Sequence, residues 1–186
     1  MVKIMAQGGK GLAAFALIIG LLGAGAGGFY LVNEFLLKPD VVPVEEVILP
    51  KARLYSTETP SITSGTTITI NFTDATFDTH NAYNYSTSQY VIPEAGIYEI
   101  SAQFAIYADL GDFLVIQLFN GTALKTRRAT TASRPTNYFG VTFSDLYNAS
   151  AGDRLSIKAY SYNTGAFSRA IFGGQYHTFF CIAKLP

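Results

Sequence analysis

The residues that could do chemistry in this chain are few: two histidines, His80 and His177, and one cysteine, Cys181. Their spacing fits no His/Cys metal motif, and a single cysteine cannot form an internal disulfide. His80 follows Asp78 closely, but no serine stands in a nucleophile-elbow motif that would complete a hydrolytic site. We therefore expect no enzyme and no bound cofactor. Cys181 lies in an apolar segment and is interpreted as a small buried residue, with an intermolecular disulfide as the alternative.

Asp109 and Asp112 flank Leu110-Gly111 and could place two carboxylates in a calcium-binding loop. Calcium takes more oxygen ligands than two aspartates supply, and the others would have to converge from further loops. A polar hairpin turn is therefore the preferred interpretation, and calcium stays a minor alternative.

One charge cluster stands out, and it has no acidic residue between Leu124 and Tyr138. It has two interpretations: a solvated loop, or a ligand patch for anionic sugars or an acidic protein. Its members are Lys125, Arg127, Arg128 and Arg134.

Four sequons could carry N-linked glycan if the chain lies outside the cytoplasm of a eukaryote or archaeon. Among them Asn120 is the preferred site, because Asn120-Gly121 is a strong signal for an exposed hairpin turn. The four asparagines are Asn71, Asn84, Asn120 and Asn148.

The chain has 186 residues and zero formal net charge, so no overall charge field points to nucleic acid as a partner. From Gly11 to Leu37 only Glu34 is charged at neutral pH, and as a helix this stretch would span about 40 Å, against about 30 Å for a hydrocarbon core. With Lys3 and Lys10 on its N-terminal side, the positive-inside rule predicts that the C-terminal part faces out. We expect a cytoplasmic tail at 1–10, a transmembrane helix at 11–37, a Pro-containing stalk at 38–50 and a head at 51–186.

Two other interpretations of the N-terminus involve cleavage. Ala24-Gly25-Ala26 after an apolar stretch could be the cleavage site of a secretory signal. Lys10-Gly11-Leu12 resembles the processing site of archaeal type IV pilin-like proteins. The preferred location is the cell membrane, single-pass with the C-terminal head outside, and the alternatives are a secreted protein or a virion or filament surface.

Residues 51–186 read as a succession of short alternating segments separated by turns. After Gly96, an apolar residue recurs at every second position, which predicts a strand with one core face. No amphipathic helix is expected in this part of the chain. Many short strands with Gly-containing turns are typical of an all-β sandwich.

The segment from Phe77 to Phe104 resembles the central strands of the C1q-like family, which shares its shape with the tumour necrosis factor (TNF) superfamily. The Gly152-Asp153 turn and the closing aromatic strand are also similar to that family, although Phe180-Cys181-Ile182 departs from its usual final triplet. The resemblance implies a C1q/TNF-like jelly-roll β-sandwich, here preceded by one N-terminal transmembrane α-helix. It is carried by Phe77, Asp78, Tyr83, Tyr90, Pro93, Gly96, Tyr98 and Phe104.

The last strand has apolar residues on both faces, so one face must be covered by something outside the sandwich. The resemblance implies a homotrimer with one sheet against the threefold axis, whereas loops covering that face are the alternative. We expect Tyr176, Phe180 and Ile182 at the trimer interface. The predicted function is a membrane-anchored trimeric recognition module for an extracellular protein or glycan. The alternative is a structural, self-assembling surface protein.

Overall fold

A computed structural model of the chain describes residues 47–133 and 136–186, with only the backbone at 136 and 137. Within those residues, all regular structure is β-strand, and no helix has the length and hydrophobicity needed to cross a membrane. The predicted tail, the transmembrane helix and the stalk up to residue 46 lie outside the described residues.

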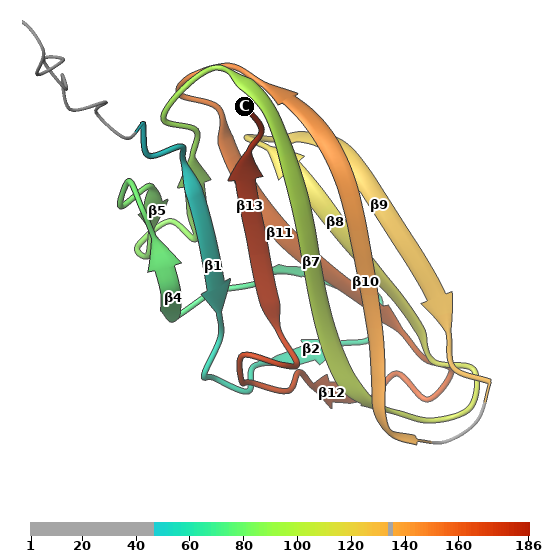
Figure 1. Cartoon of the computed structure of the whole chain (residues 1–186). Coiled ribbons are helices and arrows are strands. Elements are labelled where there is room, and N and C mark those ends of the chain that lie inside the picture. Colours follow the sequence, from blue (N-terminus) through green and yellow to red (C-terminus); the bar gives the residue numbers. More distant parts are fainter. Residues whose placement is uncertain (1–46, 134–135) are drawn as a thin grey trace, which may run out of the picture. The chain divides into compact units, whose positions relative to one another are not determined.

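One face of the sandwich is a five-stranded antiparallel sheet with the strand order β10-β7-β13-β1-β4 (Figure 1). The C-terminal strand β13 lies between β1 and β7, so strands from the two ends of the head pair directly. The strands are β1 Lys51–Tyr55, β4 Asp74–Asp78, β7 Gly96–Ala108, β10 Thr136–Ala149 and β13 Phe179–Lys184.

The opposite face is a six-stranded sheet with the order β5-β6-β11-β8-β9, in which β3 also pairs with β11. A two-stranded sheet, β12-β2, adjoins the sandwich at the end where β7 finishes (Figure 1). The remaining strands are β2 Ser61–Thr63, β3 Thr66–Thr69, β5 Tyr83–Asn84, β6 Gln89–Val91, β8 Phe113–Asn120, β9 Ala123–Thr131, β11 Arg154–Tyr162 and β12 Ser168–Ala170.

The core lies between the two larger sheets, and β7 supplies it as the alternation after Gly96 predicts. Its residues at even positions from Tyr98 to Ala108 are buried, while Glu99 and Tyr107 on the opposite side are exposed. From the six-stranded sheet, β8 contributes three buried residues at every second position: Leu114, Ile116 and Leu118. The fold class predicted for residues 51–186, an all-β sandwich, is confirmed.

β9 is an edge strand that the sequence did not predict. The Asn120-Gly121 signal is confirmed, because β8 and β9 form a hairpin whose turn has Gly121 at φ 57°. β9 itself is almost wholly exposed and has no alternating apolar residues, so its sequence looks like a solvated loop. Charged residues on an exposed edge strand also discourage pairing with another chain.

An ion-pair network holds the β7–β8 turn. The guanidinium of Arg169 on β12 donates to Asp112 Oδ2 at 2.8 Å and to Asp109 Oδ2 at 2.6 Å. Both carboxylates are thus directed at Arg169. Across the residues that the structure describes, no group of three or more His, Cys, Asp or Glu side chains could hold a metal ion.

Arg169→Met should lower the free energy of unfolding by about 2–3 kcal/mol, because it leaves the Asp112 carboxylate, 2% exposed, without its cation. We expect somewhat less than for a fully buried pair, since Arg169 is still partly open to water. Urea unfolding checks this. The matched control is Asp109→Asn, which removes the exposed partner and should cost less than about 1 kcal/mol. Equal losses in the two variants would contradict the assignment.

Candidate functional site

The six-stranded sheet carries cations and no acids. In the strands of this sheet, all of them described, there is no Asp or Glu. The five-stranded sheet instead combines Lys51, Arg53 and Lys184 with Asp74, Asp78, Glu99 and Asp145. The head, nearly neutral as a whole, therefore has one basic sheet. Its cations are Lys125, Arg127, Arg128, Arg154 and Lys158.

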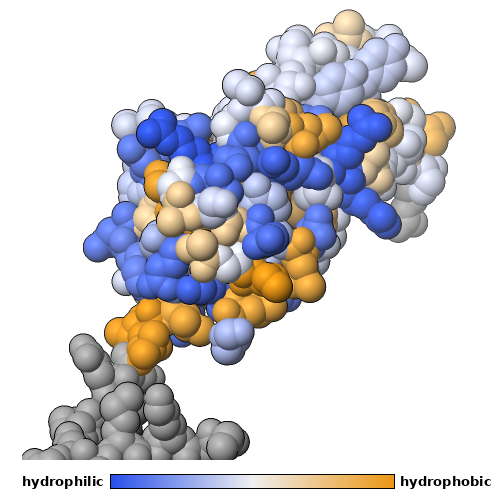
Figure 2. Space-filling model, turned by 90° about the horizontal axis from the view of Figure 1, so that it is seen from above, coloured by the Kyte–Doolittle hydropathy of each residue, from blue (hydrophilic) through white to orange (hydrophobic). Residues whose placement is uncertain are grey.

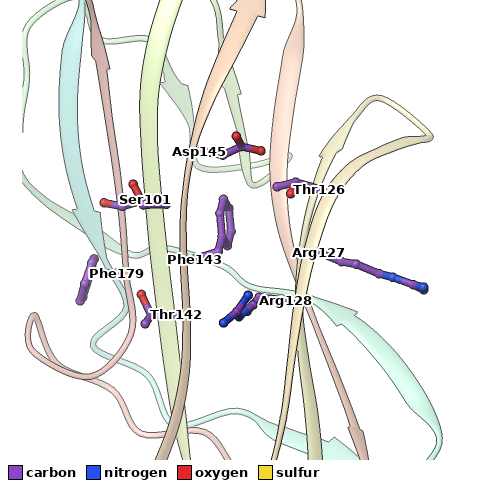
Figure 3. Close-up of a pocket in the computed structure, with 9 residues that line it drawn as sticks. Ser101, Thr126, Arg127, Arg128, Thr142, Phe143, Asp145 and Phe179 are labelled. Carbon is purple, nitrogen blue, oxygen red and sulfur yellow. The ribbon is translucent and has the colours of Figure 1, made fainter.

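The predicted ligand patch lies on this sheet, but its members do not form one cluster. Arg127 pairs with Gln117 in the β8–β9 register and faces outward, whereas Arg128 pairs with Ile116 and emerges on the core side. Figure 3 shows the two side chains leaving β9 in opposite directions. Lys125 lies at the β-bulge of the hairpin, and Arg134 is outside the described residues.

Arg128 enters a groove where the edges of the two sheets meet. This groove, of about 600 Å³, is bordered by β9 on one side and by Phe143 and Asp145 of β10 on the other (Figure 3). No ion pair or hydrogen bond joins the Arg128 side chain to another residue within 47–133 and 136–186. The groove combines the cations of Arg127 and Arg128 with the Asp145 carboxylate and several hydroxyl groups, so its charge is mixed.

Arg127 borders a second hollow, of about 380 Å³, on the outer face of the six-stranded sheet. No acidic residue lines this hollow, which combines apolar, hydroxyl and amide side chains with the Arg127 guanidinium. Lys158 of β11 lies across β8 from Arg127, because Gln117 pairs with both residues. The Lys158 ammonium sits 4.1 Å from the ring centroid of Phe119. Lys158 is therefore a residue of this site that the sequence analysis did not identify. Its position two residues before Tyr160 in β11 indicates only that the two side chains lie on the same face of the strand.

The outer face of the five-stranded sheet is the second candidate surface, and it corrects the predicted trimer interface. Phe180 and Ile182 are only 1% and 2% exposed, within the core of one chain. Tyr176 is 73% exposed but lies in the turn before β13. The outward residues of β13 are Phe179 and Cys181, both half-buried, so the side chains of Phe180 and Ile182 are not available to a subunit interface.

An aromatic cluster lies on this outer face, toward the end where β7 finishes. Tyr138 stacks on Phe172 at 4.5 Å, and Tyr107 packs on the same ring at 4.3 Å. His177 lies against Tyr138 at 4.8 Å. Tyr107 and Tyr138 remain about half exposed. Large exposed aromatic groups of this kind are typical of interaction surfaces.

Arg53 covers the middle of the same face. Its guanidinium lies 4.9 Å from the Phe179 ring centroid and donates to Cys181 Sγ at 3.4 Å and to the Gln175 carbonyl at 3.0 Å. Cys181 is thus a half-buried residue on the sheet surface rather than a core residue, which corrects the sequence interpretation.

Figure 2 shows a side of the head on which hydrophobic residues form small separate groups among hydrophilic ones.

The one Asp-His pair close in sequence has a structural role. The Asp78 carboxylate accepts hydrogen bonds from the backbone N–H groups of Tyr83 at 2.9 Å and His80 at 3.4 Å. The His80 ring contacts the Thr79 hydroxyl through Nδ1 at 3.0 Å. Asp78 therefore closes a turn and does not orient the imidazole.

The four sequons differ in accessibility, and Asn120 is the least suited. Its Nδ2, where a glycan would attach, donates to the Tyr147 hydroxyl at 3.1 Å, and its Oδ1 accepts the Arg154 N–H. Its amide is also the main cause of the lowered pKa of Asp153. Asn71 is half-buried, with its oxygen accepting from Ser88. Asn84 and Asn148 are exposed.

In cells that glycosylate secreted proteins, Asn84→Gln and Asn148→Gln should each remove one glycan's mass, while Asn120→Gln should leave the mass of the glycoprotein unchanged. Intact mass measured before and after deglycosylation checks this. The reason is that the attachment nitrogen of Asn120 is engaged within the fold. A glycan found on Asn120 would contradict this ranking.

Sequence comparison gives no relative: no protein-family model matches, and no match was found among curated proteins. Solved structures do match. Murine APRIL at pH 5.0 has a TM-score of 0.55 at 12% identity, over 74% of this chain and 100% of that chain. The globular domain of zebrafish complement 1qA gives 0.54 at 12% identity, over 75% and 98%. Eiger TNF from S. frugiperda gives 0.55 at 13% identity, over 75% and 94%. The head is therefore similar in fold to C1q and TNF jelly rolls.

Proposed function

We propose that this chain is a membrane-anchored, outward-facing recognition module that binds an anionic glycan through the outer face of its six-stranded sheet. The observation that carries the proposal is the absence of Asp and Glu from the described strands of that sheet, whose outer face carries Arg127 and Lys158. A face of one charge sign attracts an oppositely charged ligand and raises its encounter rate. The anchor at residues 11–37 and the outside location rest on the sequence alone.

We further propose that three heads associate through the outer face of the five-stranded sheet. That face offers the aromatic cluster of Tyr107, Tyr138 and Phe172, together with Phe179. Burying such rings in an interface stabilises the assembly through the hydrophobic effect. The six-stranded sheet of each subunit then stays accessible, and three copies bind a repeating glycan more tightly than one.

Calorimetric titration of the full chain with a heparin-derived octasaccharide tests the ligand assignment. We expect binding that weakens steeply as salt is raised, and none to a neutral chitin oligosaccharide. The double variant Arg127→Ser/Lys158→Ser should lose most of the affinity. Its matched control is Lys51→Ser/Lys184→Ser on the five-stranded sheet, which should keep it.

Three results would count against the proposal. Absence of octasaccharide binding at low salt would overturn it. Tighter binding of a polyglutamate peptide would move the ligand class to acidic proteins. Binding of duplex DNA with the same affinity as the octasaccharide would show that the outer face of the six-stranded sheet recognises negative charge alone.

A further inference from the structure

The hollow beside Arg127 arises from the side-chain sizes on three adjacent strands. Its floor is Val115 of β8, only 8% exposed, with Ala129 opposite it on β9. Larger side chains stand around this floor: Phe113 and Tyr160 pack edge to face with ring centroids 6.5 Å apart. Small residues between large ones leave a depression, here of about 380 Å³, which is within the size range of small-ligand sites.

Two polar groups at one side of the hollow lack partners. Gln117 Oε1 is buried and accepts no hydrogen bond from any residue that the structure describes. Arg127, directly opposite on β9, makes no ion pair and no side-chain hydrogen bond within the same residues. A buried acceptor without a donor is costly to the fold, and a ligand that donates to it recovers that cost. The site therefore has one buried acceptor without a donor beside one exposed cation that is free to pair with an anion.

We propose that this hollow binds an acidic monosaccharide carrying an N-acyl group, an inference that rests on the proposed function and names its ligand class. The carboxylate pairs with Arg127, whose planar guanidinium suits it. The amide N–H of the N-acyl group donates to Gln117 Oε1, which a rotation of the Gln117 side-chain amide turns from its buried position toward the hollow. The acyl methyl and the ring face pack against Phe113 and Tyr160. The hydroxyl groups of Thr67 and Tyr160, which also line the hollow, serve the sugar hydroxyls.

A peptide C-terminus offers the same carboxylate and amide N–H, but the surroundings favour the sugar. β8 is paired on both sides, with β9 and β11, so its main chain is already used by the sheet. A peptide main chain would find no free edge on β8, which forms the floor of the hollow, and would have to pair with the outer edge of β9 instead. A sugar needs only side-chain groups, and its hydroxyls match the threonine and tyrosine hydroxyls there.

Saturation-transfer NMR and calorimetry on the full chain test this with the methyl glycoside of N-acetylneuraminic acid as the probe. Two comparison ligands each carry only one of its two recognition groups. Methyl glucuronide has the acid without the N-acyl group, and methyl N-acetylglucosaminide has the N-acyl group without the acid. We expect measurable binding of the first probe and at least about tenfold weaker binding of the other two.

Three variants locate the site. Arg127→Met should weaken binding about tenfold or more. The matched control, Arg128→Met, changes the next residue on the opposite side of β9 and should leave binding unchanged. Gln117→Leu should also weaken binding while raising the thermal unfolding midpoint, because it removes the unpaired acceptor. A variant that is more stable yet binds less excludes misfolding as the cause.

The outcomes separate this inference from the proposed function. Octasaccharide binding without binding of the N-acetylneuraminic acid glycoside overturns the monosaccharide site alone. Equal affinity for methyl glucuronide overturns the role of the N-acyl group, and an unaffected Arg127→Met variant overturns the location. Tighter binding of N-acetylphenylalanine than of the sugar would assign the hollow to a peptide terminus instead.

Discussion

Phe180→Ala is expected to lower the free energy of unfolding of the head by about 3–5 kcal/mol. Phe180 is 1% exposed and packs against two aromatic residues of the core, Phe72 at 5.8 Å and Tyr90 at 6.3 Å between ring centroids. Removing its ring leaves a cavity that these neighbours cannot fill. Urea unfolding measured by tyrosine fluorescence and circular dichroism gives the change.

The matched control for this variant is the neighbouring residue. Phe179→Ala removes the same ring from the outer face of β13, where it contacts the Arg53 guanidinium. It should cost about 1 kcal/mol in the isolated head. The reverse order, with Phe179→Ala the more damaging at a protein concentration too low for assembly, would contradict the placement of Phe180 in the core.

Tyr107→Asp is expected to convert the assembled protein to single subunits. Tyr107 is 51% exposed, packs on Phe172 and belongs to the proposed subunit interface, so the change places three carboxylates in or near a buried apolar contact. Sedimentation equilibrium of the full chain in detergent measures the mass.

Tyr162→Asp provides the comparison, because Tyr162 is 50% exposed and ends β11 in the six-stranded sheet. It should leave the mass of the assembly unchanged. If Tyr107→Asp kept the mass of the unmodified protein, or if Tyr162→Asp alone dissociated it, the interface would lie elsewhere.

The strands with a clear alternation could be predicted from the sequence. Along β7, Tyr98, Ile100 and Phe104 take the core face as expected, because polar residues separate them. The β8–β9 turn also follows from local sequence, since Gly121 suits the positive φ that the turn requires. Such signals depend on neighbouring residues alone.

The orientation of β13 could not be predicted, because both of its faces are apolar. Alternation gives no preference between Phe179 and Phe180. The choice is made by pairing with β7, which places Phe180 opposite the buried Ala102 and Phe179 opposite Gln103. Exposed edge strands such as β9 are missed for a related reason, since nothing in their own sequence requires burial.

The candidate site could also be predicted only in part, because its arrangement depends on strand pairing. Arg127 and Arg128 looked like one patch because they are adjacent in sequence, yet adjacent residues of a strand point to opposite faces. Lys158 joins Arg127 only through the intervening strand β8. The Asp109 and Asp112 carboxylates, considered for calcium, both accept hydrogen bonds from Arg169, which is distant in sequence.

Chemical-shift mapping of the backbone amides during titration with the heparin-derived octasaccharide tests the central claim most directly. The account predicts that the shifted amides fall on β8, β9, β11 and β3, with the largest changes around Gln117 and Arg127. Shifts confined to β1, β7 and β13 of the five-stranded sheet, or to the turns at the ends of the sandwich, would contradict it.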